Sequence, residues 1–399
     1  MKWEKKKLCE CTEYITDGDH QPAPKADKGV HFIKIKDIVN NQVSFDAQVY
    51  VPQEYYDNLP MERKPQKEDV LYTVVGSFGI PSYVQTDELF CFERNIALLH
   101  PNKDIEPRFL YYSLKNPAFY KGVEIVANGS AQKLIPLSKL KDLKISVPDK
   151  EAQRHIADIL SAYDDLIENN QRQIKLLEEA AQRLYKEWFV DLRFPGHENT
   201  KIADGVPEGW SKSTVSEVSA VLRRGISPKY NEKARGIVIN QKCIRQTIVS
   251  YDEARTQEKK YPDELKMMES DILICSTGAG TLGRVGQIFE AKGNATLDSH
   301  VTLIRANERV GQQYLFWSLK MQQDYLMSAG KGSTNQLELS RETIGNCKIL
   351  MPEQKIAEQA EKNFVAIHNK MKECSMQIAR LREARNLLLP KLMSGEVEA

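Results

Sequence analysis

Residues 148–194 form one long stretch in which apolar side chains recur every three or four residues. The steps alternate four and three throughout, which predicts the seam of a coiled coil rather than the broader stripe of a surface helix. No Gly or Pro lies between Glu151 and Phe194, so we predict one helix of about 40 residues and roughly 60 Å. The seam positions are Ile156, Leu160, Tyr163, Ile167, Asn170, Ile174, Leu177, Ala181, Leu184 and Trp188. The alternative is a long surface helix with no partner.

A second helix of the same kind is predicted after Pro352, which argues against that alternative. Its seam consists of Ala357, Ala360, Phe364, Ile367, Met371, Cys374, Ile378, Leu381, Arg385, Leu388 and Leu392. We expect Pro390 and Gly395 to end it. Asn170 is a polar residue inside the first seam, where such residues fix register and partner number. The second seam starts sooner after its proline than the first does after Pro148, so we expect the helices to start unequally.

The two halves of the sequence repeat each other. Six short segments match in the same order at an offset near 205 residues, which is strong evidence of a duplication. The clearest pair is Phe109-Leu-Tyr-Tyr-Ser-Leu-Lys with Tyr314-Leu-Phe-Trp-Ser-Leu-Lys. A second pair is Asp69-Val-Leu-Tyr-Thr-Val-Val-Gly with Asp271-Ile-Leu-Ile-Cys-Ser-Thr-Gly. Two similar helices in one chain favour antiparallel pairing, with one globular unit at each end and pseudo-twofold symmetry.

Each half is predicted to be a mixed globular unit followed by a long helix, and the fold class is α+β. Short β-rich runs separated by Gly, Pro, Asn and Asp predict strands. The clearest are Val30–Ile35, Val70–Val75, Ile237–Ile239 and Ile272–Cys275. One amphipathic helix is expected in each unit, around Pro107–Lys115 and Gln312–Gln322. The first long helix should end at Phe194-Pro195-Gly196, and His197–Gly209 should be a loop.

Composition limits the possible functions. The 399 residues carry a net charge of +1, whereas a protein that grips DNA alone usually has a basic excess. Any nucleic-acid role must therefore use local patches or share the work with a partner. The seven cysteines are scattered, and we interpret them as reduced thiols of a cytoplasmic protein. No apolar run approaches the ~20 residues that span a bilayer, and the basic N-terminus lacks the apolar core of a secretory signal.

The chain shows no sign of a catalytic site. Gly278-Ala-Gly280-Thr-Leu-Gly283 matches the GxGxxG pattern of dinucleotide and S-adenosylmethionine loops. The residues after it alternate like a strand instead of opening a helix, so we predict a hairpin turn. No Walker loop, HExxH, GxSxG or Cys/His dyad is present, and neither is a metal-ligand spacing.

Basic and polar residues near turns are the candidates for contacting DNA. Arg and Lys can bind phosphates and guanine, and Gln and Asn can bind adenine. For any single residue, solvated surface is the competing explanation. The candidates are Lys34, Lys36, Arg94, Ser130, Gln132 and Lys133 in the first unit, and Arg223, Arg224, Lys229, Lys242, Arg245, Arg284, Lys331, Ser333 and Asn335 in the second. Because these positions differ between the units, two readers of different short sequences would suit them.

The order of several segments resembles one known family. The segments are Val147-Pro-Asp-Lys-Glu-Ala-Gln-Arg-His-Ile-Ala-Asp-Ile-Leu160, Val206-Pro-Glu-Gly-Trp210, the Asp271 repeat and Leu388-Leu-Pro-Lys-Leu-Met-Ser-Gly. Together with the duplication, they make nearly the whole chain similar to the specificity (S) subunit of a Type I restriction-modification system.

The resemblance implies two target-recognition domains, at 1–147 and at 196–351 with an entry linker at 196–209. It also implies two conserved helical regions, at 148–195 and 352–399, that form an antiparallel coiled coil. Each domain would recognise half of a split double-stranded DNA target, and the coil would set the gap. The partners implied are two methyltransferase (M) subunits and restriction (R) subunits. S-adenosylmethionine, ATP and Mg are expected on those partners and no cofactor on this chain, which would be non-catalytic by itself.

Two other functions stay open at this point. One is a coiled-coil scaffold with no DNA role, for which sequence-independent binding would be the sign. The other is a stand-alone S-adenosylmethionine-dependent DNA methyltransferase that uses the glycine loop.

Overall fold

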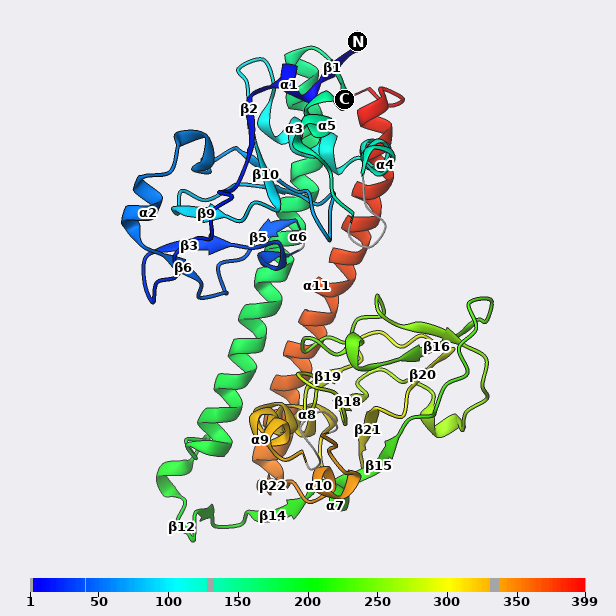
Figure 1. Ribbon diagram of the computed structural model, residues 1–399. Helices are drawn as coiled ribbons and strands as arrows, with labels where there is room; N and C mark the ends of the chain where they lie inside the picture. Colours follow the sequence, from blue (N-terminus) through cyan, green and yellow to red (C-terminus); the bar gives the residue numbers. More distant parts are fainter. Residues whose placement is uncertain (1–2, 40, 128–132, 331–336, 399) are drawn as a thin grey trace. The chain divides into compact units, whose positions relative to one another are not determined.

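A computed structural model describes residues 3–39, 41–127, 133–330 and 337–398 (Figure 1). The chain divides into two compact units. The first unit comprises Met1–Glu168 and Ile378–Ala399, and the second comprises Asn169–Gln377. Both long helices contribute to both units: helix α6 (Lys150–Tyr185) gives its first half to the first unit, and helix α11 (Gln354–Ser394) gives its first half to the second.

The first unit mixes short strands with short helices. In chain order its other elements are β1 (Glu4–Lys7), α1 (Leu8–Cys11), β2 (Thr12–Asp17), β3 (Val30–Ile33), η1 (Ile35–Asp37), β4 (Ile38–Val39), β5 (Gln42–Val43), β6 (Tyr50–Val51), α2 (Gln53–Asp57), η2 (Met61–Arg63), β7 (Val70–Thr73), β8 (Pro81–Tyr83), β9 (Phe90–Phe92), β10 (Ile96–Pro101), α3 (Pro107–Lys115), α4 (Pro117–Val126), α5 (Leu137–Asp142) and β11 (Lys144–Val147).

The second unit has the same character. Its other elements are the π-helical turn η3 (Lys186–Val190), η4 (His197–Asn199), β12 (Ile202–Ala203), β13 (Val206–Pro207), β14 (Ser211–Thr214), α7 (Val215–Val218), β15 (Ser219–Arg224), β16 (Gly236–Ile239), η5 (Gln241–Cys243), β17 (Arg255–Gln257), η6 (Asp263–Leu265), β18 (Ile272–Cys275), β19 (Val285–Gln287), β20 (Ala295–Leu297), β21 (Val301–Ala306), α8 (Gln312–Met321), α9 (Gln323–Ser328), α10 (Arg341–Gly345) and β22 (Lys348–Met351).

The sheets of the two units share one topology, which confirms the predicted repeat. Each unit has a four-stranded antiparallel sheet, in the order β2-β10-β7-β8 or β15-β21-β18-β19. Each also has a three-stranded sheet, in the order β6-β3-β9 or β17-β16-β20, with one antiparallel and one parallel pair. The predicted strands and both predicted helices are present, and α3 matches the predicted bounds. Helix α8 is not amphipathic as predicted, because every residue from Gln313 to Leu319 is buried.

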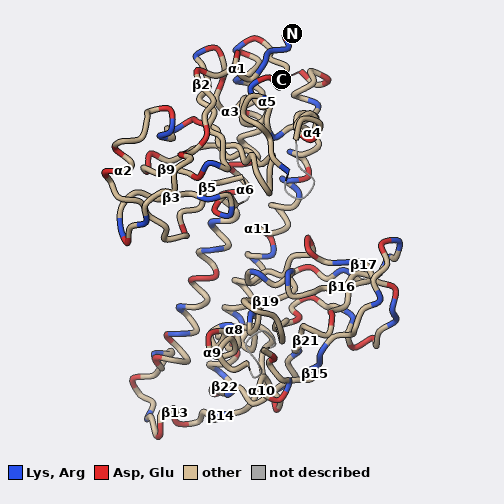
Figure 2. Tube along the Cα trace, viewed as in Figure 1, with Lys and Arg blue, Asp and Glu red and all other residues tan. Residues whose placement is uncertain are grey.

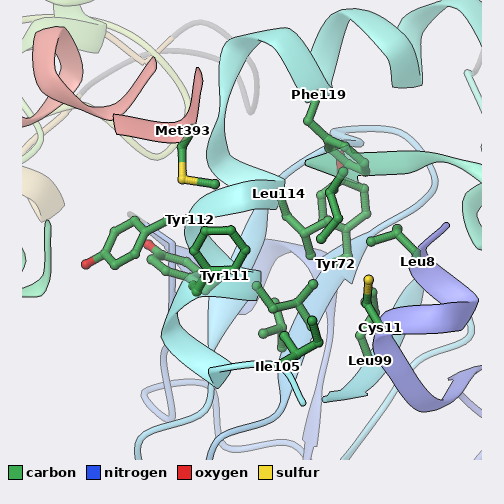
Figure 3. Close-up of a cluster of buried hydrophobic side chains, with 14 of the residues drawn as sticks. Leu8, Cys11, Tyr72, Leu99, Ile105, Tyr111, Tyr112, Leu114, Phe119 and Met393 are labelled. Carbon is green, nitrogen blue, oxygen red and sulfur yellow. The ribbon is translucent and has the colours of Figure 1, made fainter. Parts of the chain in front are cut away.

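The core of the first unit lies between its four-stranded sheet, helix α3 and the two long helices (Figure 3). Helix α3 buries every residue from Phe109 to Leu114. Tyr72 and Leu99 come from the sheet, and Met393 comes from helix α11. Because a buried Leu or Phe side chain stabilises a fold by about 1.5–3 kcal/mol, this shared cluster ties both long helices to the unit.

Within the first unit the long helices pair antiparallel. Ile156 and Leu160 of α6 share a core with Leu389 and Leu392 of α11. Farther along α6, Asp164 forms an ion pair with Arg385. Contacts later in α6 are therefore made with residues earlier in α11, as expected for antiparallel helices.

The second unit has its own packing of the two helices. Ala181 and Tyr185 of α6 share a core with Ala360 and Phe364 of α11. Toward the start of α6 in this unit, the Cys374 thiol lies 3.6 Å from Gln173 Oε1. The pairing is again antiparallel. Seam residues of both helices are buried or half-buried in their units, and Asn170 is buried.

Three predictions about the helix ends were wrong. Pro390 does not end helix α11, which continues to Ser394. A proline inside a helix costs about 3 kcal/mol, but Leu389, Leu392 and Met393 are buried and offset that cost. Gly395, with φ 75°, closes the helix as predicted. The helices also start equally, because α6 begins at Lys150 and α11 at Gln354, each two residues after its proline.

The third wrong prediction concerns the end of the first helix. Regular α-helix stops at Tyr185, and the π-helical turn η3 follows, with the Asp191 amide donating to the Lys186 carbonyl over 2.8 Å. A π-turn adds a residue, so Phe189 is buried while the seam residue Trp188 is half-buried. The predicted loop His197–Gly209 contains the small hairpin β12–β13.

The distribution of charged residues and the state of the cysteines agree with the expectations from composition. Figure 2 shows Lys and Arg interspersed with Asp and Glu in both units. All seven cysteines are free, as predicted, and only Cys9 is exposed. Of the helices in the described ranges, none combines the length and apolarity needed to cross a membrane.

Candidate nucleic-acid interface

In each unit, several loops meet where a pair of parallel strands ends. Strand β3 pairs parallel with β9, and β16 with β20, so the carboxyl ends of each pair lie together. We call the loops there the strand-end edge. The first edge consists of residues 34–37, 74–80 and 93–95, and the second of residues 240–243, 276–284 and 298–300.

Hydrogen bonds hold the loops of each edge together. In the first unit the Ile35 amide donates to Glu93 Oε1 over 2.7 Å, and the Val74 amide donates to the Asn95 carbonyl over 2.9 Å. In the second unit the Ser276 amide donates to the His300 carbonyl over 2.8 Å, which is the counterpart of the Val74 bond. Loops beside a rigid scaffold are common carriers of binding residues.

The first edge gathers several of the predicted DNA-binding cations. Lys34 and Lys36 follow β3, and Arg94 follows β9. Lys36 and Arg94 are exposed and Lys34 is half-buried. In the described part of the chain, no carboxylate lies within ion-pair distance of these three side chains. Lys133 lies beside the edge, because its carbonyl accepts from the Gly76 amide over 3.2 Å. Its ammonium lies 5.4 Å from the Phe78 ring and 3.9 Å from Glu124.

The predicted cations of the second unit are more dispersed, and most are neutralised. Lys242 and Arg284 belong to the second edge, and neither has an ion pair within the described ranges. The other four each contact a glutamate, pairing Arg223 with Glu264, Arg224 with Glu338, Lys229 with Glu258, and Arg245 with Glu253. An Arg engaged by a carboxylate must break that contact before it can bind a phosphate.

Five predicted residues lie outside the described residues: Ser130, Gln132, Lys331, Ser333 and Asn335. The segments that flank them reach the edges, because Val75 bridges to Leu134 and Thr277 bridges to Glu338.

The glycine motif is a hairpin turn, as predicted. Gly278–Gly283 connects β18 to β19, which pair antiparallel. Gly278 and Gly283 have φ of 104° and 76°, and a Cβ at Gly283 would lie 2.4 Å from the Met327 amide nitrogen. The glycines therefore serve backbone geometry, and no helix follows to bind a phosphate.

Sequence reasoning missed three side chains of the second edge. Gln241, Thr277 and His300 form a hydrogen-bonded chain there. They lie on three separate segments, so no spacing in the sequence connects them. Beside them, burial raises the pKa of the Asp298 carboxyl, which accepts from the His300 amide over 2.8 Å. Among the described residues, no cluster of three or more His, Cys, Asp or Glu side chains could hold a metal ion.

Comparison with known proteins identifies the family. A family model described as "Type I restriction modification DNA specificity domain" matches residues 1–179 and 207–372, once in each repeat. The chain belongs to the Type I restriction-modification DNA specificity family.

Members of this family match over most of their length. The Type I restriction enzyme HindI specificity subunit of Haemophilus influenzae is 24% identical, over 92% of this chain and 94% of that protein. The MjaIX specificity subunit of Methanocaldococcus jannaschii is 26% identical, over 76% of this chain and 71% of that protein. Among solved structures, the Type I S subunit from M. genitalium has a TM-score of 0.60 at 17% identity, covering 98% of this chain and 96% of that one.

The predicted family and fold class are therefore confirmed. Two copies of the specificity domain, each with its own sheets, fit recognition of a two-part DNA target. Because the members of this family are specificity subunits, membership also indicates that the chain works with DNA and other subunits.

Proposed function

We propose that this chain selects the DNA target of a Type I restriction-modification complex and is not itself catalytic. In this proposal, residues 1–147 and 196–351 are the target-recognition domains, and each strand-end edge contacts one half of a split site. The observation that carries it is the duplication, because two scaffolds of the same topology present different polar side chains at equivalent edges.

Different side chains on equal scaffolds support two different half-sites. The first edge offers Lys34, Lys36 and Arg94, whereas the second offers Lys242, Arg284 and a hydrogen-bonded polar cluster. Lys and Arg bind phosphates in any sequence, and polar donors distinguish bases in the major groove.

We further propose that residues 148–195 and 352–399 dock two methyltransferase subunits, with restriction subunits joining that complex in the cytoplasm. Exposed apolar side chains on the long helices support this. Leu176 is 63% exposed in the second unit, and Leu387 is 63% exposed in the first. A partner that covers these side chains would remove their apolar surface from water, which favours association.

A fixed gap between the half-sites is the property that tests the proposal. Methylation patterns of cells with and without the gene would first define the target. The complex with its methyltransferase partners is then titrated with duplexes whose gap is one base pair shorter or longer. We expect at least a 100-fold loss of affinity, because helix α6 continues from one unit into the other, so a shifted half-site loses its contacts.

A duplex with scrambled half-sites is the control and should bind as weakly as the altered gaps. Equal affinity for all these duplexes would contradict the proposal and favour a scaffold without DNA readout.

A further inference from the structure

The second strand-end edge contains three side chains joined in one hydrogen-bonded chain. Gln241 Nε2 donates to Thr277 Oγ1 over 2.8 Å, and Thr277 Oγ1 lies 2.7 Å from His300 Nδ1. Gln241 belongs to η5, Thr277 follows β18, and His300 follows β20. This series of hydrogen-bonded side chains reaches the surface at His300, which is exposed.

Neighbouring side-chain and backbone groups hold these side chains in place. The Thr281 hydroxyl lies 3.5 Å from Gln241 Oε1, and a Cβ at Gly278 would lie 2.7 Å from that oxygen. Gly278 therefore makes room for the Gln241 amide. The His300 amide donates to Asp298 Oδ1 over 2.8 Å, so backbone and ring of His300 are both tied to neighbours.

The hydrogen bonds are compatible with one tautomer of His300 that leaves a donor at the surface. An amide nitrogen can only donate, so the Thr277 oxygen accepts from Gln241. Thr277 still has its own hydroxyl proton, and His300 Nδ1 lies 2.7 Å away as an acceptor for it. With Nδ1 accepting, the neutral ring carries its proton on Nε2, and that N–H is available to a ligand at the exposed end.

The first unit lacks this arrangement at equivalent places. Ile35 begins η1 as Gln241 begins η5, and Val75 bridges to Leu134 as Thr277 bridges to Glu338. Asn95 accepts from the Val74 amide as His300 accepts from the Ser276 amide. Since the first unit forms the same sheets with Ile35 and Val75, the fold does not require the hydrogen-bonded side chains of the second unit.

We propose that His300 is a specificity residue that donates from Nε2 to a guanine in one half-site, with Thr277 and Gln241 as its positioning residues. This rests on the proposed function. Guanine suits a lone donor because N7 and O6 are both acceptors in the major groove, whereas adenine places an amino group beside its N7. The exposed ammonium of Lys242, next to Gln241 in sequence, can bind the adjoining phosphate.

The test compares the methylation patterns of cells that carry the complete system with wild-type chain or with single variants. His300→Ala should relax one base position in one half-site, by about 10- to 100-fold in discrimination. The other half-site and the gap should stay unchanged. Thr277→Val should reduce discrimination at the same base position, but by less than His300→Ala does. Thr277→Ser keeps the hydroxyl and should retain the discrimination of the wild type. His197→Ala in the linker is the matched control.

Two outcomes would overturn the assignment. One is uniform loss of methylation at all targets by folded His300→Ala complex, which would indicate a phosphate contact. The other is an unchanged motif. Thermal unfolding distinguishes folded from misfolded variants, and the Thr277→Val and Thr277→Ser pair decides the question if His300→Ala misfolds. A wild-type system without a two-part motif would instead contradict the proposed function.

Discussion

His368, on helix α11 in the second unit, is buried, and burial favours the neutral form of its ring. It is 5% exposed, its Nδ1 donates to Gln287 Oε1 over 3.0 Å, and its ring lies 4.3 Å from that of Phe289. Nε2 is buried, with no hydrogen-bond partner among the described residues. Burial lowers the pKa of His368 from 6.5 to about 4, because a charged ring would lose its hydration.

This lowered pKa makes the stability of the second unit depend on pH. The folded state binds the proton less tightly than the unfolded state does. The stabilisation is therefore complete above pH 6.5 and is lost as the pH falls toward 4, by up to about 1.4 kcal/mol per pH unit. Urea unfolding of wild type and His368→Gln between pH 7.5 and 5 measures the effect.

The glutamine variant keeps an N–H donor for Gln287 but cannot titrate. We expect the unfolding free energy of the variant to fall less steeply than that of the wild type below pH 6.5. The difference in unfolding free energy between the two proteins should therefore narrow or reverse as the pH is lowered. Parallel curves for the two proteins would show that His368 is not the responsible group.

At the scale of elements, one polar cluster joins three helices of the first unit. Asp164 of α6 pairs with Arg385 of α11, accepts from the Tyr112 hydroxyl of α3 over 2.8 Å, and lies 3.5 Å from the Lys115 ammonium. The Arg385 and Lys115 side chains are each 12% exposed. Burial lowers the pKa of Lys115 to about 8, and Asp164 opposes that shift.

Removing Asp164 should therefore be costly. Asp164→Ala leaves two largely buried cations without their carboxylate, and we expect a loss of about 2–4 kcal/mol in the unfolding free energy of the first unit. Asp165→Ala is the matched control, because the Asp165 side chain is 60% exposed and 3.8 Å from Arg108, and it should cost under about 1 kcal/mol. Denaturant unfolding of the full chain compares them, and equal losses would refute a special role for Asp164.

Elements with strong local signals could be predicted from the sequence. Helix α3 begins at Pro107, a residue suited to a first helical turn, and its repeat in α8 strengthened the prediction. The seam predicted both long helices because heptad spacing is local information. The course past Pro390 could not be predicted, since it depends on Leu389, Leu392 and Met393 packing into a distant core. The Gln241, Thr277 and His300 cluster escaped because only folding brings those three segments together.

At the scale of the whole molecule, the near-neutral charge predicts how DNA binding is shared. The net charge is +1, and four of the predicted DNA-binding cations are held by glutamates. Both features reduce the capacity of the chain to displace counterions from DNA by itself. We expect the chain alone to bind a target duplex weakly and with a shallow salt dependence. The complex with methyltransferase subunits should bind tightly and with a steeper one.

Fluorescence anisotropy of a labelled duplex between about 50 and 200 mM salt measures both slopes. Comparable affinity and slope for the isolated chain and the complex would mean that this chain supplies the phosphate contacts itself.

Strand β1 has a consequence for anyone who handles the protein. Glu4–Lys7 pairs along its length with Lys144–Val147, and helix α6 starts three residues after that strand ends. Because these two strands form a two-stranded sheet, removing Glu4–Lys7, or displacing them with a bulky tag, would leave Lys144–Val147 without its strand partner just before helix α6. We expect such a variant to bind its partners more weakly even though its recognition loops are unchanged, so a protein fused at this end should be compared with the untagged protein.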